Sequence, residues 1–187
     1  TPLCFPACLR RGSGYGWIML VGTHAMLPVC GCLAIDGIAL HRGGGLVFPA
    51  WTLWLIGFFG VLPDFCSPHI ALEDRHASWS HTVWFLAGLM VLLPMAGTYL
   101  ERSCRWPVVA ACWTAALLHV AADTISGGVA WLYPWNPRVT GDYFIPLDYW
   151  IWSDAGFVVL TWILLRTIPV WEGRAIRRSF PSETSAS

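Results

Sequence analysis

The chain of 187 residues is long enough for one domain and marginal for two. Hydrophobic residues make up 56% of it and charged residues 12%, about half of the roughly 25% typical of soluble domains. The 11 basic residues, all arginine, balance 11 acidic ones, so the composition excludes a disordered chain and argues against a nucleic-acid-binding protein. Two classes remain, an unusually apolar globular protein and a membrane protein.

The distribution of charged residues favours the membrane protein. Long windows without any charged residue cover 12–35, 43–63, 76–100 and 106–122. A membrane-spanning helix needs about 20 mainly apolar residues, and three of these windows reach that length. The fourth reaches it if Asp123 lies at the membrane boundary, and a fifth span over 149–171 is weaker because it contains Asp154 and Arg166. The sequence therefore predicts an all-α, polytopic membrane bundle of four to five transmembrane helices.

The ends of the chain differ in composition from this apolar part. Residues 1–18 contain two arginines and a Gly-rich stretch, and we expect a leader there that is not native, with Met19 as an alternative start. Residues 19–171 form the expected transmembrane domain that carries the site. Residues 172–187 form an expected polar tail.

Histidine and aspartate side chains gather on one predicted membrane face. Consecutive spans run antiparallel, so the start of an odd-numbered span lies on the same side as the end of an even-numbered one. This alternation brings together the ends that carry His24, Asp64, His76, His81, His119 and Asp123. Imidazoles and carboxylates together suit zinc, manganese or iron. The sequence therefore predicts a site for a divalent metal, most simply zinc.

The spacing within each span says which side chains can face a common point. His119 and Asp123 are four residues apart, one turn along one helix face, which suits either a shared cation or a hydrogen bond within the helix. His76 and His81 lie roughly 140° apart around a regular helix. We therefore expect His76 in the preceding loop, a cap from Ser78 or Ser80, and His81 pointing inward from the first helical turn. A single histidine in an apolar helix is more often a packing residue, and His41 and His69 are expected in solvated loops.

Four short motifs in this order resemble the YdjM-type family of membrane-bound, predicted metal-dependent hydrolases. The matching pieces are Thr23-His24, Gly60-Val-Leu-Pro-Asp64, His76-Ala-Ser-Trp-Ser-His81-Thr, and Leu118-His119-Val-Ala-Ala-Asp123-Thr with the Trp131-Leu-Tyr-Pro134 loop. The resemblance covers residues 19–150. Ala77 and Ser78 replace an Arg-Gly pair of the family pattern, so a cation that could contact an anionic substrate is missing. Remotely, the order of ligand types is also similar to the zinc-dependent phospholipase C and single-strand nuclease superfamily, although no histidine follows Asp123 here.

The resemblance implies a metal-dependent hydrolase that acts on a phosphoester or lipid-like substrate at the membrane boundary. In that reading, the expected ligands are His24, His81, His119 and Asp123, with His76 next. Asp64 is either a ligand or the base that orients the attacking water, and His76 is its companion catalytic candidate. The alternative is a non-catalytic metal-binding protein or small transporter with a site near the membrane midplane. A membrane scaffold that needs no metal is a third class.

Arginine counts predict the orientation of the bundle. The site side carries four arginines, or two without residues 1–18, and the opposite side carries seven. Because cytoplasmic loops carry the excess of basic residues, the tail is expected in the cytoplasm of a bacterium and the site toward the periplasm, in the inner membrane. This count assumes all five spans.

Overall fold

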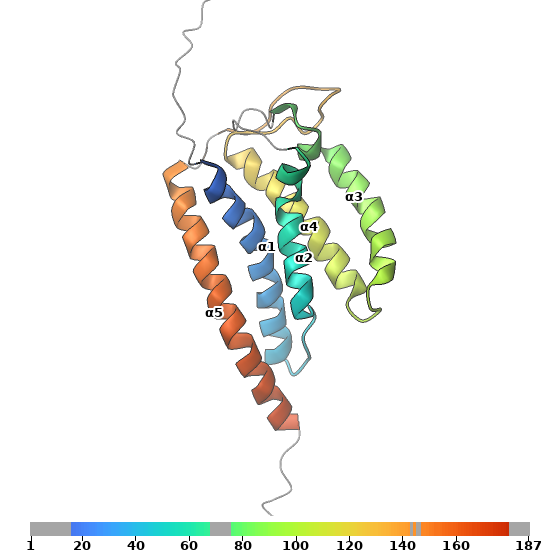
Figure 1. The fold of residues 1–187 in the computed structure, drawn as a ribbon, viewed down its shortest axis with the longest axis vertical. Helices are drawn as coiled ribbons and strands as arrows, with labels where there is room; N and C mark the ends of the chain where they lie inside the picture. The colour runs from blue at the N-terminus through green and yellow to red at the C-terminus, as the bar shows by residue number, and fades with distance from the viewer. Residues whose placement is uncertain (1–15, 68–75, 143, 145–146, 180–187) are drawn as a thin grey trace, which may run out of the picture.

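The computed structural model describes residues 16–67, 76–142, 144 and 147–179, which fold as an elongated bundle of helices (Figure 1). The helices are α1 (Gly16–His41), α2 (Ala50–Cys66), α3 (Val83–Ala96), α4 (Arg105–Ile125) and α5 (Leu147–Ser179). Short 3₁₀ segments, η2 (Trp79–His81) and η3 (Gly97–Tyr99), flank α3. Within the described ranges the only β-type pairing is two isolated bridges. The all-α prediction is confirmed.

Three of the described helices contain stretches long and apolar enough to cross a membrane, namely Gly22–His41, Arg105–Ile125 and Tyr149–Gly173. Helices α2 and α3 are also apolar but shorter, with 17 and 14 residues. The span over 149–171, for which the sequence evidence is weakest, thus lies in α5, the longest of the described helices. Its Arg166 is exposed and lies over the Trp162 ring, 5.8 Å from the centroid, which keeps the charge off the packed face. These helices agree with a membrane bundle.

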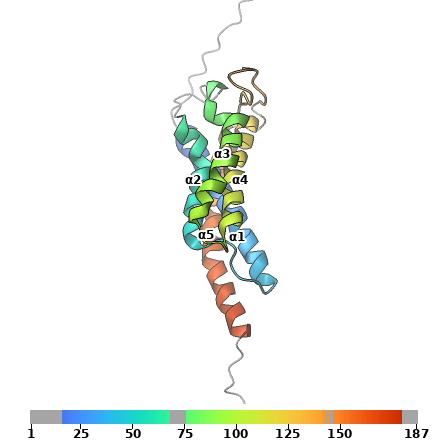
Figure 2. The ribbon, with the colours of Figure 1, turned by 90° about the vertical axis from the view of Figure 1, so that its right-hand side faces the viewer.

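Helix α1 lies between α5 and α2, and α4 packs against α2 and α3 (Figures 1 and 2). The antiparallel course puts the start of α1, the end of α2, the start of α3 and the end of α4 at the same end of the bundle. The core between α2 and α4 is filled by fully buried side chains, among them Ile56, Val108, Ala115 and Ala116. The small size of Ala115 and Ala116 allows α4 to approach its neighbours closely. We call the shared end the site end.

Gly60 sets the crossing of α1 and α2 near the site end. A Cβ atom there would overlap the carbonyl oxygen of His24 and lie 3.1 Å from its carbonyl carbon. It would also lie 3.2 Å from Cγ of Pro28. Only glycine leaves room for this approach, which brings the His24 turn of α1 against the last turns of α2.

One carboxylate fastens α5 to α1 at the same end. Asp154 Oδ1 accepts a hydrogen bond from the Thr23 backbone N–H at 2.6 Å and another from the Thr23 hydroxyl. Gly22 lies against this carboxylate, since a Cβ there would be 3.0 Å from Cγ of Asp154. At the other end of α1, buried Asp36 accepts hydrogen bonds from the backbone of the α1–α2 loop, at Val47 and Phe48. The buried carboxylate of Asp36 and the half-buried carboxylate of Asp154 are therefore hydrogen-bonded rather than isolated.

The connection after α4 folds over the start of α3. Val129 and Thr140 exchange backbone hydrogen bonds of 3.0 and 2.8 Å, and Val83 N–H donates to the carbonyl of Trp131 at 2.9 Å. The domain boundaries expected from the sequence stay predictions, but α1 begins at Gly16 and α5 continues to Ser179, past both expected limits of the helical part. Residues 1–15 and 180–187 lie outside the described residues.

Candidate metal centre

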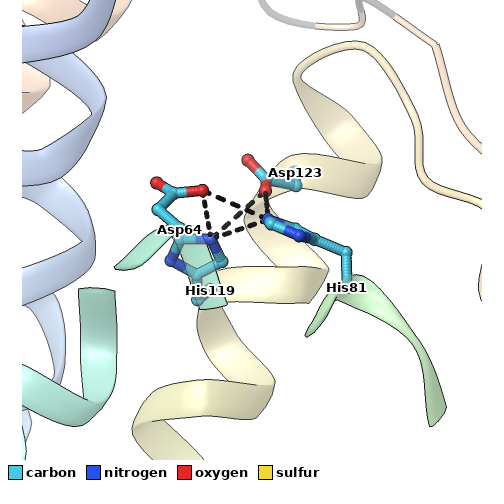
Figure 3. Close-up of side chains that lie close together, drawn as sticks. All are labelled: Asp64, His81, His119 and Asp123. Atoms are coloured by element: carbon cyan, nitrogen blue, oxygen red, sulfur yellow. Dashed lines mark hydrogen bonds and ion pairs between the residues drawn. The ribbon is translucent and has the colours of Figure 1, made fainter. Parts of the chain in front are cut away.

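Four side chains from three segments meet at the site end (Figure 3). Asp64 comes from the last turn of α2, His81 from η2, and His119 and Asp123 from successive turns of α4. One donor atom of each lies within 4.8 Å of the others. Because His119 and Asp123 are four residues apart on α4, both side chains project from the same face of the helix and reach the cluster together.

The donor atoms lie at the distances expected around one ion. His81 Nε2 is 3.2 Å from His119 Nε2, 3.2 Å from Asp64 Oδ1 and 3.1 Å from Asp123 Oδ2. His119 Nε2 is 3.3 Å from each of the same two carboxylate oxygens. Ligands about 2.0–2.1 Å from a zinc ion, arranged as a tetrahedron, are roughly 3.3–3.4 Å from each other. The residues present therefore fit a divalent ion.

Three of the four side chains of the cluster are buried, and the fourth is partly exposed. The side chains of His81 and His119 are 0% exposed and that of Asp123 is 3% exposed, whereas Asp64 is 23% exposed. Two carboxylates this close together inside an apolar bundle repel each other unless a cation or protonated partners compensate them. Access from outside is therefore on the Asp64 side.

A backbone carbonyl orients His119. Its Nδ1 lies 2.7 Å from the Gly60 carbonyl oxygen, which can only accept a hydrogen bond. Nδ1 therefore carries a proton, and in the neutral ring Nε2 presents its lone pair to the cluster. Gly60 thus has two roles, the close helix crossing and the orientation of this imidazole.

The model of the YdjM inner membrane protein family matches residues 19–178, which include all four cluster residues. The chain belongs to this family. No curated protein and no solved structure matches the chain. Membership confirms the resemblance inferred from the sequence motifs and assigns the chain to a family of inner membrane proteins.

Two of the histidines that the sequence predicts as ligands, His24 and His76, lie outside the cluster of four. His24 is its immediate neighbour, with Nε2 3.6 Å from Asp123 Oδ1 and its ring centroid 4.0 Å from that of His119. His76 lies before η2, and its Nε2 is 3.2 Å from the carbonyl oxygen of Gly127 in the connection after α4. The expected roles of His24 and His76 as ligands, and of His76 as a catalytic group, stay predictions.

The segment before α3 differs from the sequence expectation. The cap of α3 is Thr82, whose hydroxyl accepts from Phe85 N–H at 3.3 Å, so the expected cap by Ser78 or Ser80 is wrong. His81 accordingly lies in η2, just before the helix. The two serine hydroxyls instead contact the His81 ring, at 2.9 Å for Ser78 and 3.3 Å for Ser80. Hydroxyl side chains compete with the backbone for hydrogen bonds, which explains why this segment is not α-helical.

The remaining histidines are remote from the cluster or outside the description. His41 is exposed at the opposite end of α1, where it ends the helix rather than lying in a loop. His69 lies outside the described residues. Sequence reasoning missed the contribution of backbone carbonyls from α2, and only the Gly60-Val-Leu-Pro-Asp64 motif hints at them.

Proposed function

We propose that this YdjM family member is a membrane-embedded metal-dependent hydrolase. The observation that supports it is the set of five donor–donor distances of 3.1–3.3 Å among Asp64, His81, His119 and Asp123. The ion is divalent, with zinc the best match to two imidazoles and a carboxylate, and manganese or iron as alternatives.

The four residues divide by burial into two roles. His81, His119 and Asp123 are enclosed and would hold the ion, a two-histidine, one-carboxylate set of the kind found in catalytic zinc sites. Held by these residues, a divalent ion would supply Lewis-acid chemistry, lowering the pKa of a bound water toward neutrality and polarising a phosphoryl or acyl oxygen. Asp64, on the accessible side, either completes the ligand set or accepts the proton of the attacking water.

The substrate is a phosphoester or lipid-like molecule that reaches the site from the membrane boundary. Exposed aromatic side chains surround the start of α3, where the Trp84 and Trp135 rings lie 4.9 Å apart and Trp79 packs edge-on against Phe85. Tryptophan prefers the interface between head groups and hydrocarbon. A lipid head group and water meet at that level.

The position of the cluster favours hydrolysis over transport. A transport site is expected near the membrane midplane with access from both faces. The four donors lie instead at one end of the bundle, in the last turn of α2, in η2 and in the last turns of α4. A non-catalytic metal-binding role at the same place is the remaining competitor.

The protein crosses the inner membrane several times, with the site end toward the periplasm. Arg42 follows α1, and Arg102 and Arg105 lie at the α3–α4 turn, all at the end opposite the cluster. The C-terminal part of α5 adds further arginines on that side. This excess supports a cytoplasmic location for the end opposite the site.

Elemental analysis of the full chain purified in detergent tests the proposal. Wild-type protein is expected to hold about one equivalent of metal, and the double variant His119→Ala, Asp123→Ala to hold almost none. His41→Ala, which removes an exposed histidine at the opposite end, is the matched control and keeps its metal. Equal, negligible metal in wild type and double variant would overturn the metal site.

A second measurement separates a hydrolase from a metal-binding protein. The loaded protein is incubated with a chromogenic phosphodiester presented in lipid micelles, and Asp64→Asn is compared with wild type. Turnover that disappears in Asp64→Asn supports hydrolysis. A fully loaded protein that cleaves neither this probe nor a phospholipid would favour the non-catalytic role.

A further inference from the structure

The His81 ring is connected to α2 through two buried serines. Ser80 Oγ lies 2.6 Å from the carbonyl oxygen of Pro63, the residue before Asp64. A carbonyl oxygen has no proton to give, so the Ser80 hydroxyl must be the donor. Its single proton is therefore committed to Pro63.

This commitment fixes the next proton. Ser78 Oγ lies 2.9 Å from Ser80 Oγ, and since the Ser80 proton is already used, Ser78 must donate to Ser80. Ser78 Oγ also lies 2.9 Å from His81 Nδ1. With its own proton committed to Ser80, Ser78 accepts there, and the proton of this contact belongs to Nδ1. Ser80 Oγ also lies 3.3 Å from Nδ1 and, with its proton donated to Pro63, can only accept there. The hydrogen bonds therefore run from His81 to both serines, from Ser78 to Ser80, and from Ser80 to Pro63.

We propose that Ser78 and Ser80 are positioning residues that act through His81. The directed chain keeps the proton on Nδ1 of the neutral ring, so the lone pair of Nε2 faces the Asp64 and Asp123 oxygens 3.2 and 3.1 Å away. The opposite tautomer would put a proton where a metal ligand needs an electron pair. The effect on metal affinity rests on the proposed metal site, whereas the tautomer itself does not.

Burial keeps solvent away from the hydrogen-bonded chain of His81, Ser78 and Ser80. Ser80 and His81 are 0% exposed and Ser78 is 4% exposed, so bulk water has little access to replace a missing hydroxyl. The arrangement parallels that of His119 in α4, whose Nδ1 donates directly to the carbonyl of Gly60. Gly60, like Pro63, belongs to α2. Both imidazoles of the cluster are thus oriented by carbonyls of α2, one directly and one through two hydroxyls.

Nitrogen NMR of the metal-free protein tests the tautomer. Full-length protein in detergent, labelled with ¹⁵N in histidine rings, is recorded with the rings neutral, and His81→Gln identifies the His81 signals. We expect His81 protonated at Nδ1 in the wild type. In Ser80→Ala the Ser78 hydroxyl is released and becomes free to donate to Nδ1, so a fraction protonated at Nε2 should appear.

Metal affinity tests the consequence. Zinc affinity, measured by competition with a chromophoric chelator, is expected to fall about 10- to 100-fold in Ser80→Ala, the range typical of outer partners of metal ligands. Ser80→Thr keeps a hydroxyl and should restore both the tautomer and most of the affinity. Thr82→Ala is the matched control, because its buried hydroxyl bonds Trp79 O and Phe85 N–H in the same segment rather than the His81 ring. It should leave the tautomer and the affinity unchanged.

Three results overturn the proposal: Nε2 protonation in the wild type, equal loss of affinity in Ser80→Ala and Thr82→Ala, or no rescue by Ser80→Thr. The wild-type spectrum and its assignment by His81→Gln do not depend on Ser80→Ala, so the test stands even if Ser80→Ala does not fold. A wild-type protein that binds no zinc but shows the Nδ1 tautomer would refute the metal site and leave the serine chain standing. The two failures are therefore distinguishable.

Discussion

The Nε2 atoms of His81 and His119 lie 3.2 Å apart, although 38 positions separate the residues in the chain. Each ring has its other nitrogen engaged elsewhere, with Ser78 for His81 and with Gly60 for His119. Two imidazoles that turn the same type of nitrogen toward one point, beside two carboxylates, form a coordination site more readily than a pair of hydrogen bonds.

The first prediction separates ligands from neighbours. His81→Ala removes a corner of the donor set, so zinc affinity should fall by more than the roughly 100-fold limit of an outer partner. His24→Ala removes only a contact 3.6 Å from Asp123 and should keep one equivalent of zinc, with affinity lowered about tenfold. Chelator competition measures both. Equal losses would make His24 a ligand of the same rank.

The second prediction concerns Gly60. Gly60→Ala drives a methyl group into the His24 carbonyl and should lower the stability by about 1–3 kcal/mol, together with metal binding. Gly57→Ala on the same helix is the control, since its Cβ would meet Val29 at an ordinary 3.4 Å. Thermal unfolding in detergent compares the two. Similar unfolding temperatures would show that α1 and α2 are less tightly apposed than described.

The third prediction concerns the fastening of α5. Asp154→Ala removes the acceptor of both Thr23 hydrogen bonds and should destabilise the fold by about 1.5–3 kcal/mol, because hydrogen bonds to charged groups are the stronger ones. Asp154→Asn retains an acceptor and should lose less. Ser153→Ala changes a half-buried neighbour whose hydroxyl bonds the Tyr149 carbonyl of the same helix, and it should have little effect. A chain that tolerates Asp154→Ala as well as Ser153→Ala would contradict this role.

The fourth prediction concerns orientation. Pro137→Cys lies in the exposed connection at the site end, and Ser103→Cys in the exposed turn at the opposite end, and neither alters a charge. In intact cells, a maleimide that enters the periplasm but does not cross the inner membrane should label Pro137→Cys and should not label Ser103→Cys. Wild-type protein, whose native cysteines remain, gives the background. The reverse pattern would invert the proposed topology.

The sequence was sufficient for the helical class and for the end of the bundle where polar groups gather. Strict alternation of spans needs only their order, so the joint placement of Asp64, His81, His119 and Asp123 at one end followed from counting. The helix boundaries were harder to predict from the sequence. The third uncharged window begins at 76, yet α3 begins at Val83, because serine and threonine hydroxyls there bond to neighbouring groups instead of continuing a helix.

The orientation of the two imidazoles was beyond sequence reasoning for a different reason. His119 donates to the carbonyl oxygen of Gly60, and His81 is linked through Ser78 and Ser80 to that of Pro63. Every residue has a carbonyl, so the sequence does not single these two out. Only the three-dimensional crossing of α2 with α4 and η2 selects these two.

The brevity of α2 has a consequence for depth. Asp64 lies 14 residues after Ala50, roughly 21 Å of helix at 1.5 Å per residue, whereas the hydrocarbon layer is about 30 Å thick. With Ala50 anchored at the far surface, the carboxylate stops several ångströms below the near one. The protein would then carry water down to the buried linkage of a lipid, so that the lipid need not be lifted out of the leaflet.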